Sequence, residues 1–296
     1  MATRKPVRWH IALFLAPAVL VYTAIMIIPL FGTLNLSLFN EDGGVRVFVG
    51  LGNFATLFGE PLWSEAFWNA LGNNAWFFLI HMLVQNPIGI ALAAILSTPR
   101  LRMAAFYRTA IFIPTILSFV IVGFVWKLIL SPIWGIAPGM LDMVGLKSLF
   151  APWLGKEAYA LTTLALISVW QFVGIPMMLI YAALLSIPDE VLEAAEMDGA
   201  GPVSRFWYIM LPHLARAITV VVLIQTIFLL GIFGEILVTT NGGPGTSSTT
   251  LPYLIYKEAL LDFDVGTAAA GGVVAVILAN IVAFFLMRAI GKNLDA

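Results

Sequence analysis

Polar side chains occur inside apolar segments of this sequence, next to aromatic residues at helical spacing. Ser168, Gln171 and Phe172 are three and four residues apart, so they share one face of a helix. The next apolar segment has the same spacing, with Gln225, Phe228 and Leu229. Amides that hydrogen-bond hydroxyl groups, beside an aromatic ring that stacks on an apolar sugar face, suit a neutral polyhydroxylated ligand. The alternative is that each face packs against a neighbouring helix with one hydrogen bond.

Further polar residues lie within or near the ends of apolar segments, where each is a candidate site because lipid burial of polar groups is costly. They are Asn73, Asn74, Gln85, Asn86, Lys127 and Glu235. For Asn73 and Asn74, a hydrogen bond between helices is an equal alternative to a ligand contact. Lys127 is expected to extend its ammonium group to the membrane surface. Glu235 is a single acid, which is too little to indicate a proton relay.

Residue constellations typical of enzymes are missing. His10, His81 and His213 are far apart, and none has the spacing of metal ligands, so we expect no metal site. The chain has no cysteine, which excludes disulfides, thiolate ligands and cysteine nucleophiles. The phosphate-binding pattern G-x-x-x-x-G-K-[ST] is absent. We therefore expect neither a catalytic site nor a cofactor in this chain.

The composition indicates a membrane protein. Of the 296 residues, 61% are hydrophobic and only 10% are charged, whereas a globular protein carries about 25% charged residues. So few charged residues cannot cover the surface of a soluble protein of 296 residues. The net charge of -1 gives no electrostatic reason to expect nucleic-acid binding.

Six segments are apolar over the roughly 20 residues that a membrane-spanning helix needs. They are residues 11–36, 70–97, 109–131, 160–187, 215–239 and 265–290. The first is too long for the apolar part of a signal peptide and no cleavage site closes it, so we expect a retained helix. Prolines are expected to bend several spans, namely Pro17, Pro29, Pro87, Pro114 and Pro176. The prediction is an all-α polytopic membrane protein, with residues 1–296 forming one domain around a six-helix bundle.

The distribution of Lys and Arg predicts the orientation. If the N-terminus is cytoplasmic, ten basic residues lie inside: Arg4, Lys5, Arg8, Arg100, Arg102, Arg108, Arg205, Arg216, Arg288 and Lys292. Four lie in the outer loops: Arg46, Lys147, Lys156 and Lys257. Both termini are therefore predicted to be cytoplasmic, and so is the segment 188–214. The outer loops are short and rich in turn residues, as in Glu41-Asp42-Gly43-Gly44 and Asn241-Gly242-Gly243-Pro244-Gly245.

The cytoplasmic segment carries five acidic residues and one arginine between Pro188 and Pro212. A helix start is predicted there, because Ser186 can cap, Pro188 fits the first turn, and two acids follow it. The glycines and proline of Asp198–Pro202 predict its end, and a second short helix is expected from about Val203 to Met210. The result is a short helix on a glycine turn, suited to a partner's groove. Interfacial helices, the alternative, are usually basic on their polar face.

The residues of this segment resemble a known signature. Glu193-Ala194-Ala195, three residues, Gly199, nine residues, Ile209, one residue and Leu211-Pro212 match the EAA signature of ABC-importer permeases throughout. Other stretches resemble the sugar-permease branch, which includes the maltose and glycerol-phosphate importer permeases. They are Gly50-Leu51-Gly52-Asn53-Phe54, Tyr181-Ala182-Ala183-Leu184 before Ile187-Pro188, and Thr239-Thr240-Asn241-Gly242-Gly243-Pro244. The tail, with Phe263-Asp264-Val265-Gly266, Arg288 and Gly291-Lys292-Asn293-Leu294, is most similar to sorbitol/mannitol-type polyol permeases.

The resemblance implies a type I ABC importer permease of the bacterial inner membrane, which takes up a sugar, a sugar derivative or a polyol. Residues Glu193 to Gly199 are then the coupling helix, which docks into a cleft of a cytoplasmic ATPase subunit. The implied coupling residues are Glu193, Ala194, Ala195, Asp198, Gly199, Leu211 and Pro212. Glu193 is expected to offer a charge-assisted bond, and Gly199 to allow the close turn. The implied solute pathway lies near Ser168, Gln171, Phe172, Gln225 and Leu229.

The resemblance also implies partners. These are a second permease subunit, expected to form a heterodimer, two ABC ATPase subunits that bind ATP and magnesium, and a periplasmic or lipid-anchored substrate-binding protein. The binding protein is expected to deliver solute to the outer loops, including residues 240–250. Either this subunit or the second permease holds the solute site.

Two other classes compete with this hypothesis. A secondary, ion-coupled transporter needs an ion or proton site at mid-membrane and usually has internal repeats, and we identify neither. An integral membrane enzyme needs an acid–base or metal cluster, which is also missing.

Overall fold

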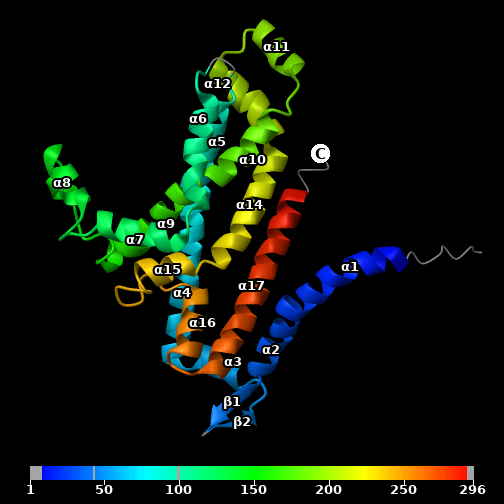
Figure 1. The fold of residues 1–296 in the computed structure, drawn as a ribbon, viewed down its shortest axis with the longest axis vertical. Coiled ribbons are helices and arrows are strands. Elements are labelled where there is room, and N and C mark those ends of the chain that lie inside the picture. The colour runs from blue at the N-terminus through cyan, green and yellow to red at the C-terminus, as the bar shows by residue number, and fades with distance from the viewer. Residues whose placement is uncertain (1–8, 43, 99–100, 292–296) are drawn as a thin grey trace, which may run out of the picture. The chain divides into compact units, whose positions relative to one another are not determined.

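The computed structural model describes residues 9–42, 44–98 and 101–291 (Figure 1). Several residues used above therefore lie outside the described residues: Arg4, Lys5, Arg8, Gly43, Arg100, Lys292, Asn293 and Leu294. The chain forms two compact units. One comprises the segment that ends at Ser64 together with Ile255–Val276, and the other comprises Glu65–Leu254 together with the segment that begins at Ile277. Each unit is described by itself.

The first unit contains a small hairpin that the all-α prediction missed. Its elements are α1 (Trp9–Tyr22), η1 (Thr23–Ile27), α2 (Ile28–Leu36), β1 (Phe39–Asp42), β2 (Val45–Phe48), α3 (Gly52–Gly59) and the first part of α17 (Val265–Gly291). The strands β1 and β2 are antiparallel, with Phe39 opposite Phe48. Asn53 Nδ2 donates hydrogen bonds to the carbonyls of Ser37, at 3.0 Å, and Phe39, at 2.8 Å. The hairpin is therefore fastened to the start of α3.

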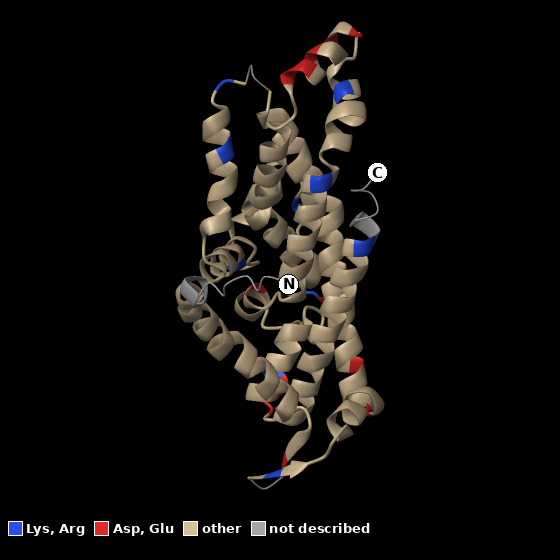
Figure 2. Cartoon of the chain, turned by 90° about the vertical axis from the view of Figure 1, so that its right-hand side faces the viewer, with Lys and Arg blue, Asp and Glu red and all other residues tan. Residues whose placement is uncertain are grey.

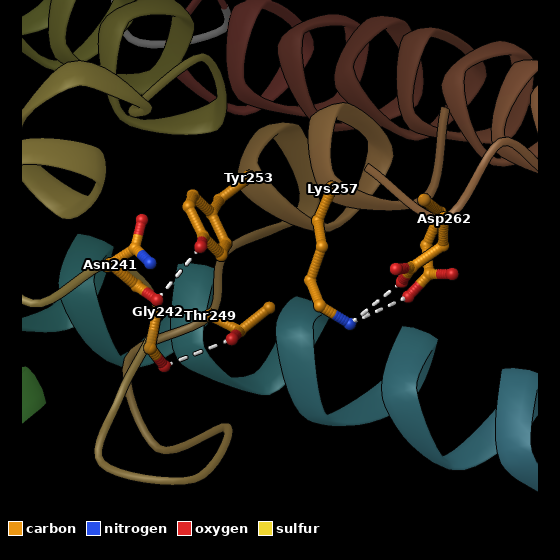
Figure 3. Close-up of polar contacts among 7 residues, drawn as sticks. Asn241, Gly242, Thr249, Tyr253, Lys257 and Asp262 are labelled. Carbon is orange, nitrogen blue, oxygen red and sulfur yellow. Dashed lines mark hydrogen bonds and ion pairs between the residues drawn. The ribbon is translucent and has the colours of Figure 1, made fainter. Parts of the chain in front are cut away.

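The turn between α16 (Leu251–Leu260) and α17 is also in this unit. The Lys257 ammonium lies 3.1 Å from Asp262 and 3.4 Å from Glu258 (Figure 3). The backbone N–H of Asp262 donates to the Lys257 carbonyl at 3.1 Å. These contacts close the turn, which presents an exposed Phe263 with a positive φ of 60°.

The second unit consists of helices joined by loops, with no strand among its described residues. Its elements are α4 (Pro61–Ile80, from Glu65 on), η2 (His81–Gln85), α5 (Asn86–Leu96), α6 (Ala104–Phe112), η3 (Ile113–Ile116), α7 (Phe119–Ile129), α8 (Ile136–Met143), η4 (Lys147–Leu149), α9 (Glu157–Phe172), α10 (Gly174–Leu184), α11 (Asp189–Met197), α12 (Pro202–Arg205), η5 (Phe206–Met210), α13 (Leu211–His213), α14 (Ala215–Leu230) and α15 (Gly234–Thr239). Its described residues include three buried apolar clusters, one around Phe77, Leu164 and Leu229, a second around Ala93, Met177 and Val221, and a third formed by Val122, Leu130 and Ile167.

The predicted spans correspond to three unbroken helices and three bent pairs. Leu13–Leu36, Pro61–Leu96 and Val265–Arg288 are each long and apolar enough to cross a membrane. The bent pairs are Ala104–Ile116 with Phe119–Ile129 (98°), Glu157–Phe172 with Gly174–Leu184 (42°), and Pro202–His213 with Ala215–Leu230 (65°). The structure therefore has up to six spans among its described residues, if each bent pair is counted as one.

Two boundaries of the predicted spans are wrong. The second span begins at Pro61 rather than at residue 70, because the helix continues through polar residues that the apolar window excluded. The fifth span was predicted as one segment over 215–239, but α14 ends at Leu230 and residues 231–233 are not helical. Hydropathy alone does not detect this break.

Prolines disturb the helices in a regular way. Three π-helical turns, η1, η2 and η5, end two residues before Pro29, Pro87 and Pro212. A proline ring clashes with the carbonyl four residues earlier, and a wider turn moves that carbonyl away. Pro114 lies in the 3₁₀ turn beside the 98° bend, whereas Pro17 lies within α1 without a break. The expectation that prolines bend the spans is thus confirmed at Pro114 and at Pro176, which lies beside the 42° bend, whereas Pro17, Pro29 and Pro87 lie in helices without a break.

Candidate functional site

The helix α11 begins at Asp189, with Pro188 as its N-cap. Asp189 and Glu190 occupy the first turn, where negative charge is favourable. The predicted cap by Ser186 is wrong, because its hydroxyl donates instead to the Ala183 carbonyl at 2.7 Å. In Figure 2, α11 carries a dense group of acidic residues, whereas charged residues are sparse along the long helices.

The helix α11 ends in a Schellman motif at the glycine that the sequence indicated. Asp198 is the C-cap and Gly199 has a φ of +81°. The N–H of Ala200 donates to the Ala195 carbonyl at 2.9 Å, and the N–H of Gly199 donates to Glu196 at 3.0 Å. This left-handed conformation is strained for a residue with a Cβ. Glycine is therefore required by the backbone, and not by crowding, since no atom lies within 4 Å of a Cβ placed there.

A second helical stretch follows, as predicted, but it runs from Pro202 to His213 and not only to Met210. Arg205 Nη1 donates to Glu196 Oε2 at 3.0 Å, which joins this stretch to α11. An open groove between the two is lined by Val191, Ala194, Ala195, Ala200, Tyr208 and Ile209, among others. Tyr208 is 80% exposed, and Met197 on α11 is 88% exposed. The loop therefore presents apolar surface.

Glu193 and Leu211-Pro212 differ in their surroundings. Glu193 is exposed, and its carboxylate forms no hydrogen bond or ion pair with any residue that the structure describes. Leu211 is half-buried, and Pro212 follows the π turn η5. The N–H of the buried Leu214 donates to Met210 and Leu211, both at 3.1 Å, before the chain turns by 65° into α14.

The polar residues predicted for a solute pathway lie in the second unit, and most of them are engaged. Ser168 Oγ and His81 Nε2 are hydrogen-bonded, 3.1 Å apart, and His81 Nδ1 donates to the Phe77 carbonyl at 2.9 Å. The imidazole also stacks on the Phe77 ring at 4.9 Å. His81, which its spacing excludes as a metal ligand, is thus the hydrogen-bond partner of Ser168. No sequence signal links two residues that are 87 positions apart.

Gln85 and Gln171 donate to backbone carbonyls. Gln171 Nε2 donates to Leu117 at 3.0 Å, and Gln85 Nε2 donates to Phe172 at 2.9 Å. Their Oε1 atoms are buried without a hydrogen-bond partner in the described chain, as is Asn86 Oδ1.

Gln225 is the most unusual of these residues. Its side chain is only 6% exposed, and neither its Nε2 nor its Oε1 has a hydrogen-bond partner among the residues described. One turn further on, Phe228 meets Phe172 edge to face, with ring centroids 5.0 Å apart. Leu229 is buried in the core. The aromatic residues that the spacing placed on one face of each helix are thus in contact between α9 and α14.

Asn73 and Asn74 hold the loop that precedes α16. Asn73 Nδ2 donates to Thr249 at 2.8 Å, Asn74 Nδ2 donates to Leu229 at 3.0 Å, and Asn74 Oδ1 accepts from the N–H of Leu251 at 2.8 Å. Within the loop, Tyr253 donates to the Asn241 carbonyl at 2.8 Å and Thr249 donates to Gly242 at 3.1 Å (Figure 3). These bonds support the alternative of a hydrogen bond between helices for Asn74, whereas Asn73 bonds to the loop.

Lys127 lies near this loop in space, and Glu235 precedes it in the sequence. Lys127 is exposed near the end of α7 and lines a cavity with Ser131, Thr239, Thr240 and Gly243, among others. Glu235 is half-buried in the first turn of α15. In residues 9–42, 44–98 and 101–291, no three His, Asp or Glu residues are grouped as metal ligands.

Comparisons with known proteins agree on one family. The model of the family described as "Binding-protein-dependent transport system inner membrane component" matches residues 85–295. The chain is 33% identical to the Probable ABC transporter permease protein YurN of Bacillus subtilis (strain 168), over 93% of this chain and 94% of that one. It is 32% identical to the Lactose transport system permease protein LacF of Rhizobium radiobacter, over 83% and 81%. The fold matches a crystal structure of a bacterial ABC transporter involved in alginate import, with a TM-score of 0.83, 23% identity and 96% of each chain covered.

Proposed function

The chain belongs to the family of inner-membrane components of binding-protein-dependent transport systems, and we propose that it is a permease subunit of an ATP-driven importer for a carbohydrate. It is a transport subunit of the membrane and not an enzyme. The solute is a sugar, a sugar derivative or a polyol. The lactose-transport relative supports this class, as do the amide and aromatic side chains of α9 and α14.

The observation that carries the proposal is the end of α11. The Schellman turn at Gly199 presents a short helix whose Glu193 carboxylate is exposed and without a partner in the described chain, and whose groove is lined by apolar side chains together with Glu190, Asp198 and Ser204. Such a helix suits the cleft of another protein. We assign this role, coupling to the ATPase, to seven residues: Glu193, Ala194, Ala195, Asp198, Gly199, Leu211 and Pro212.

The loop needs partners, since the chain has no nucleotide-binding pattern of its own. The partners are a second permease subunit, as a heterodimer, two ABC ATPase subunits that hold ATP and magnesium, and a substrate-binding protein outside the membrane. Residues 1–296 form one permease domain with six spans, both termini and the 188–214 loop in the cytoplasm. Closure of the ATPase subunits draws the coupling loops together and turns the bundle from inward-facing to outward-facing.

The solute pathway of this subunit passes Ser168, Gln171, Phe172, Gln225 and Leu229. Gln225 is its strongest member, because both amide atoms are buried without a partner among the described residues, and an amide in that state gains most from a solute hydroxyl. Ser168 contributes indirectly, through its bond with His81.

The test is co-purification followed by reconstitution. The tagged chain, expressed with its neighbouring subunits, should purify with an ATPase subunit, and vesicles containing the complex should take up solute only with ATP and the binding protein. A chain that purifies alone and transports without ATP would be a secondary, ion-coupled transporter. Thermal-shift screening of the binding protein against sugars and polyols should then identify the solute.

A further inference from the structure

Two helix breaks in the second unit lie directly against each other. The first separates η3 from α7 and bends the chain by 98°, and the second separates α9 from α10 and bends it by 42°. Gly174 is at the second break. A Cβ at Gly174 would lie 3.0 Å from the Ile111 carbonyl oxygen, from Phe112 Cα and from Thr115 Oγ1. The two segments approach this closely because glycine has no side chain.

Each break leaves backbone carbonyls without a helical donor. Leu117 is extended, with a ψ of 142°, so its carbonyl is outside both flanking helices. The carbonyl of Phe172 lacks a donor because Pro176, four residues later, has no N–H. In a membrane these groups must be satisfied inside the protein, since lipid offers no hydrogen bonds.

Side chains supply the missing bonds across the breaks. Gln171 Nε2 donates to the Leu117 carbonyl at 3.0 Å, and Thr115 Oγ1 donates to the Gln171 carbonyl at 3.0 Å. Gln85 Nε2 donates to the Phe172 carbonyl at 2.9 Å. The first two bonds run in opposite directions between the same two breaks, and Gln171 is almost fully buried.

We propose that Thr115 and Gln171 are positioning residues that lock the breaks of the third and fourth spans together, so that η3 and α10 move as one body during transport. This inference rests on the proposed import function. It assigns to Gln171 Nε2 a bond within the protein, so this nitrogen does not bind solute, while Gln171 Oε1 is buried without a hydrogen-bond partner among the described residues. Breaking the lock should slow the conformational cycle without changing how tightly solute is bound.

Thr115 allows the lock to be tested apart from the solute pathway. In the reconstituted importer, Thr115→Val keeps the size of the side chain and removes the donor, and Thr115→Ser restores it. The loss of one buried hydrogen bond changes a rate or equilibrium constant by about fivefold. We expect Thr115→Val to lower the maximal uptake rate by about that factor with an unchanged KM for the solute, and Thr115→Ser to recover it.

Thr109→Val is the matched control. Thr109 is on α6, and its hydroxyl donates only within that helix, to the Ala105 carbonyl at 3.0 Å. This variant should transport like the unmodified chain. Equal loss in both valine variants, or a raised KM in Thr115→Val alone, would overturn the proposal.

Movement can be measured directly because the chain has no cysteine of its own. Spin labels at Ile116, which is 72% exposed, and at Leu179, which is 36% exposed, report on η3 and α10. Their separation should be the same in the resting and ATP-bound importer, and should change between these states in Thr115→Val. A change in the otherwise unmodified chain would show that the breaks move independently. Failure of that chain to take up solute with ATP would contradict the import function itself.

Discussion

Glu196 Oε2 accepts a hydrogen bond from Arg205 Nη1 at 3.0 Å, which ties the two helices on either side of Gly199. Glu193, three residues earlier on the same helix, has no such partner in the part of the chain that the structure describes. Two carboxylates on one short helix are thus in different states, one engaged within the loop and one open to a partner.

Glu193→Gln should therefore weaken ATPase docking, and Glu196→Gln should not. A charge-assisted hydrogen bond contributes about 1.5–3 kcal/mol, so loss of the Glu193 charge should weaken binding of the ATPase subunit about tenfold or more. The carboxylate of Glu196 is exposed in its ion pair with Arg205. Exposed ion pairs contribute at most about 1 kcal/mol to stability. Affinity measured with the purified subunits should separate the two variants. Equal affinities would contradict the role of Glu193.

Gly199→Ala should impair coupling, whereas Gly201→Ala should not. At both glycines an added Cβ would meet open space, but φ is +81° at Gly199 and -69° at Gly201. A left-handed conformation costs a residue with a Cβ about 1–2 kcal/mol, so alanine at 199 should distort the Schellman turn. Gly199→Asp adds a charge and should abolish uptake and loosen the ATPase subunit. Membrane insertion should be normal in all three variants, and normal uptake in Gly199→Asp would contradict the assigned role.

Gln225→Leu should raise the KM for the solute without lowering Tm. An unpartnered buried amide costs about 1–3 kcal/mol, so leucine removes that cost together with the solute contact. Asn74→Leu is the contrasting variant, since both amide atoms of Asn74 are hydrogen-bonded, and its Tm should fall. Uptake kinetics and thermal unfolding of the same preparations test both. An unchanged KM in Gln225→Leu would remove this residue from the pathway.

The α16–α17 turn should lose stability at alkaline pH. The hydrogen bond with Asp262, with smaller contributions from the Glu258 and Asp262 charges, raises the pKa of Lys257 above its usual value of 10.5. A raised folded-state pKa gives stability that is complete below the unfolded pKa and is lost as pH rises through the folded value. Asp262→Asn should thus lower Tm slightly at about pH 9 and have no effect at about pH 12. A constant difference in Tm at both pH values would contradict this account.

Local sequence patterns predicted the parts of the molecule that local chemistry determines. The start of α11 after Pro188 and its end at Gly199 follow from turn residues. The partners of Ser168 and Gln171 could not be predicted, because His81 and Leu117 are distant in sequence and bond through tertiary packing. The break after Leu230 and the hairpin at Phe39–Phe48 were missed because both lie in stretches that hydropathy treats as continuous span or loop.

The three π-helical turns before Pro29, Pro87 and Pro212 have a consequence for tolerance to deletions. Each α-helical residue turns the chain by about 100°, so one residue removed from an ordinary span would rotate its far end onto the wrong neighbours. A π turn holds one residue more than an α turn. A single deletion within Phe206–Met210 would therefore remove that additional residue and restore α-helical geometry, so the helical segments on both sides would keep their faces. The π turn η5 is thus the place next to the coupling loop where the chain should tolerate the loss of one residue.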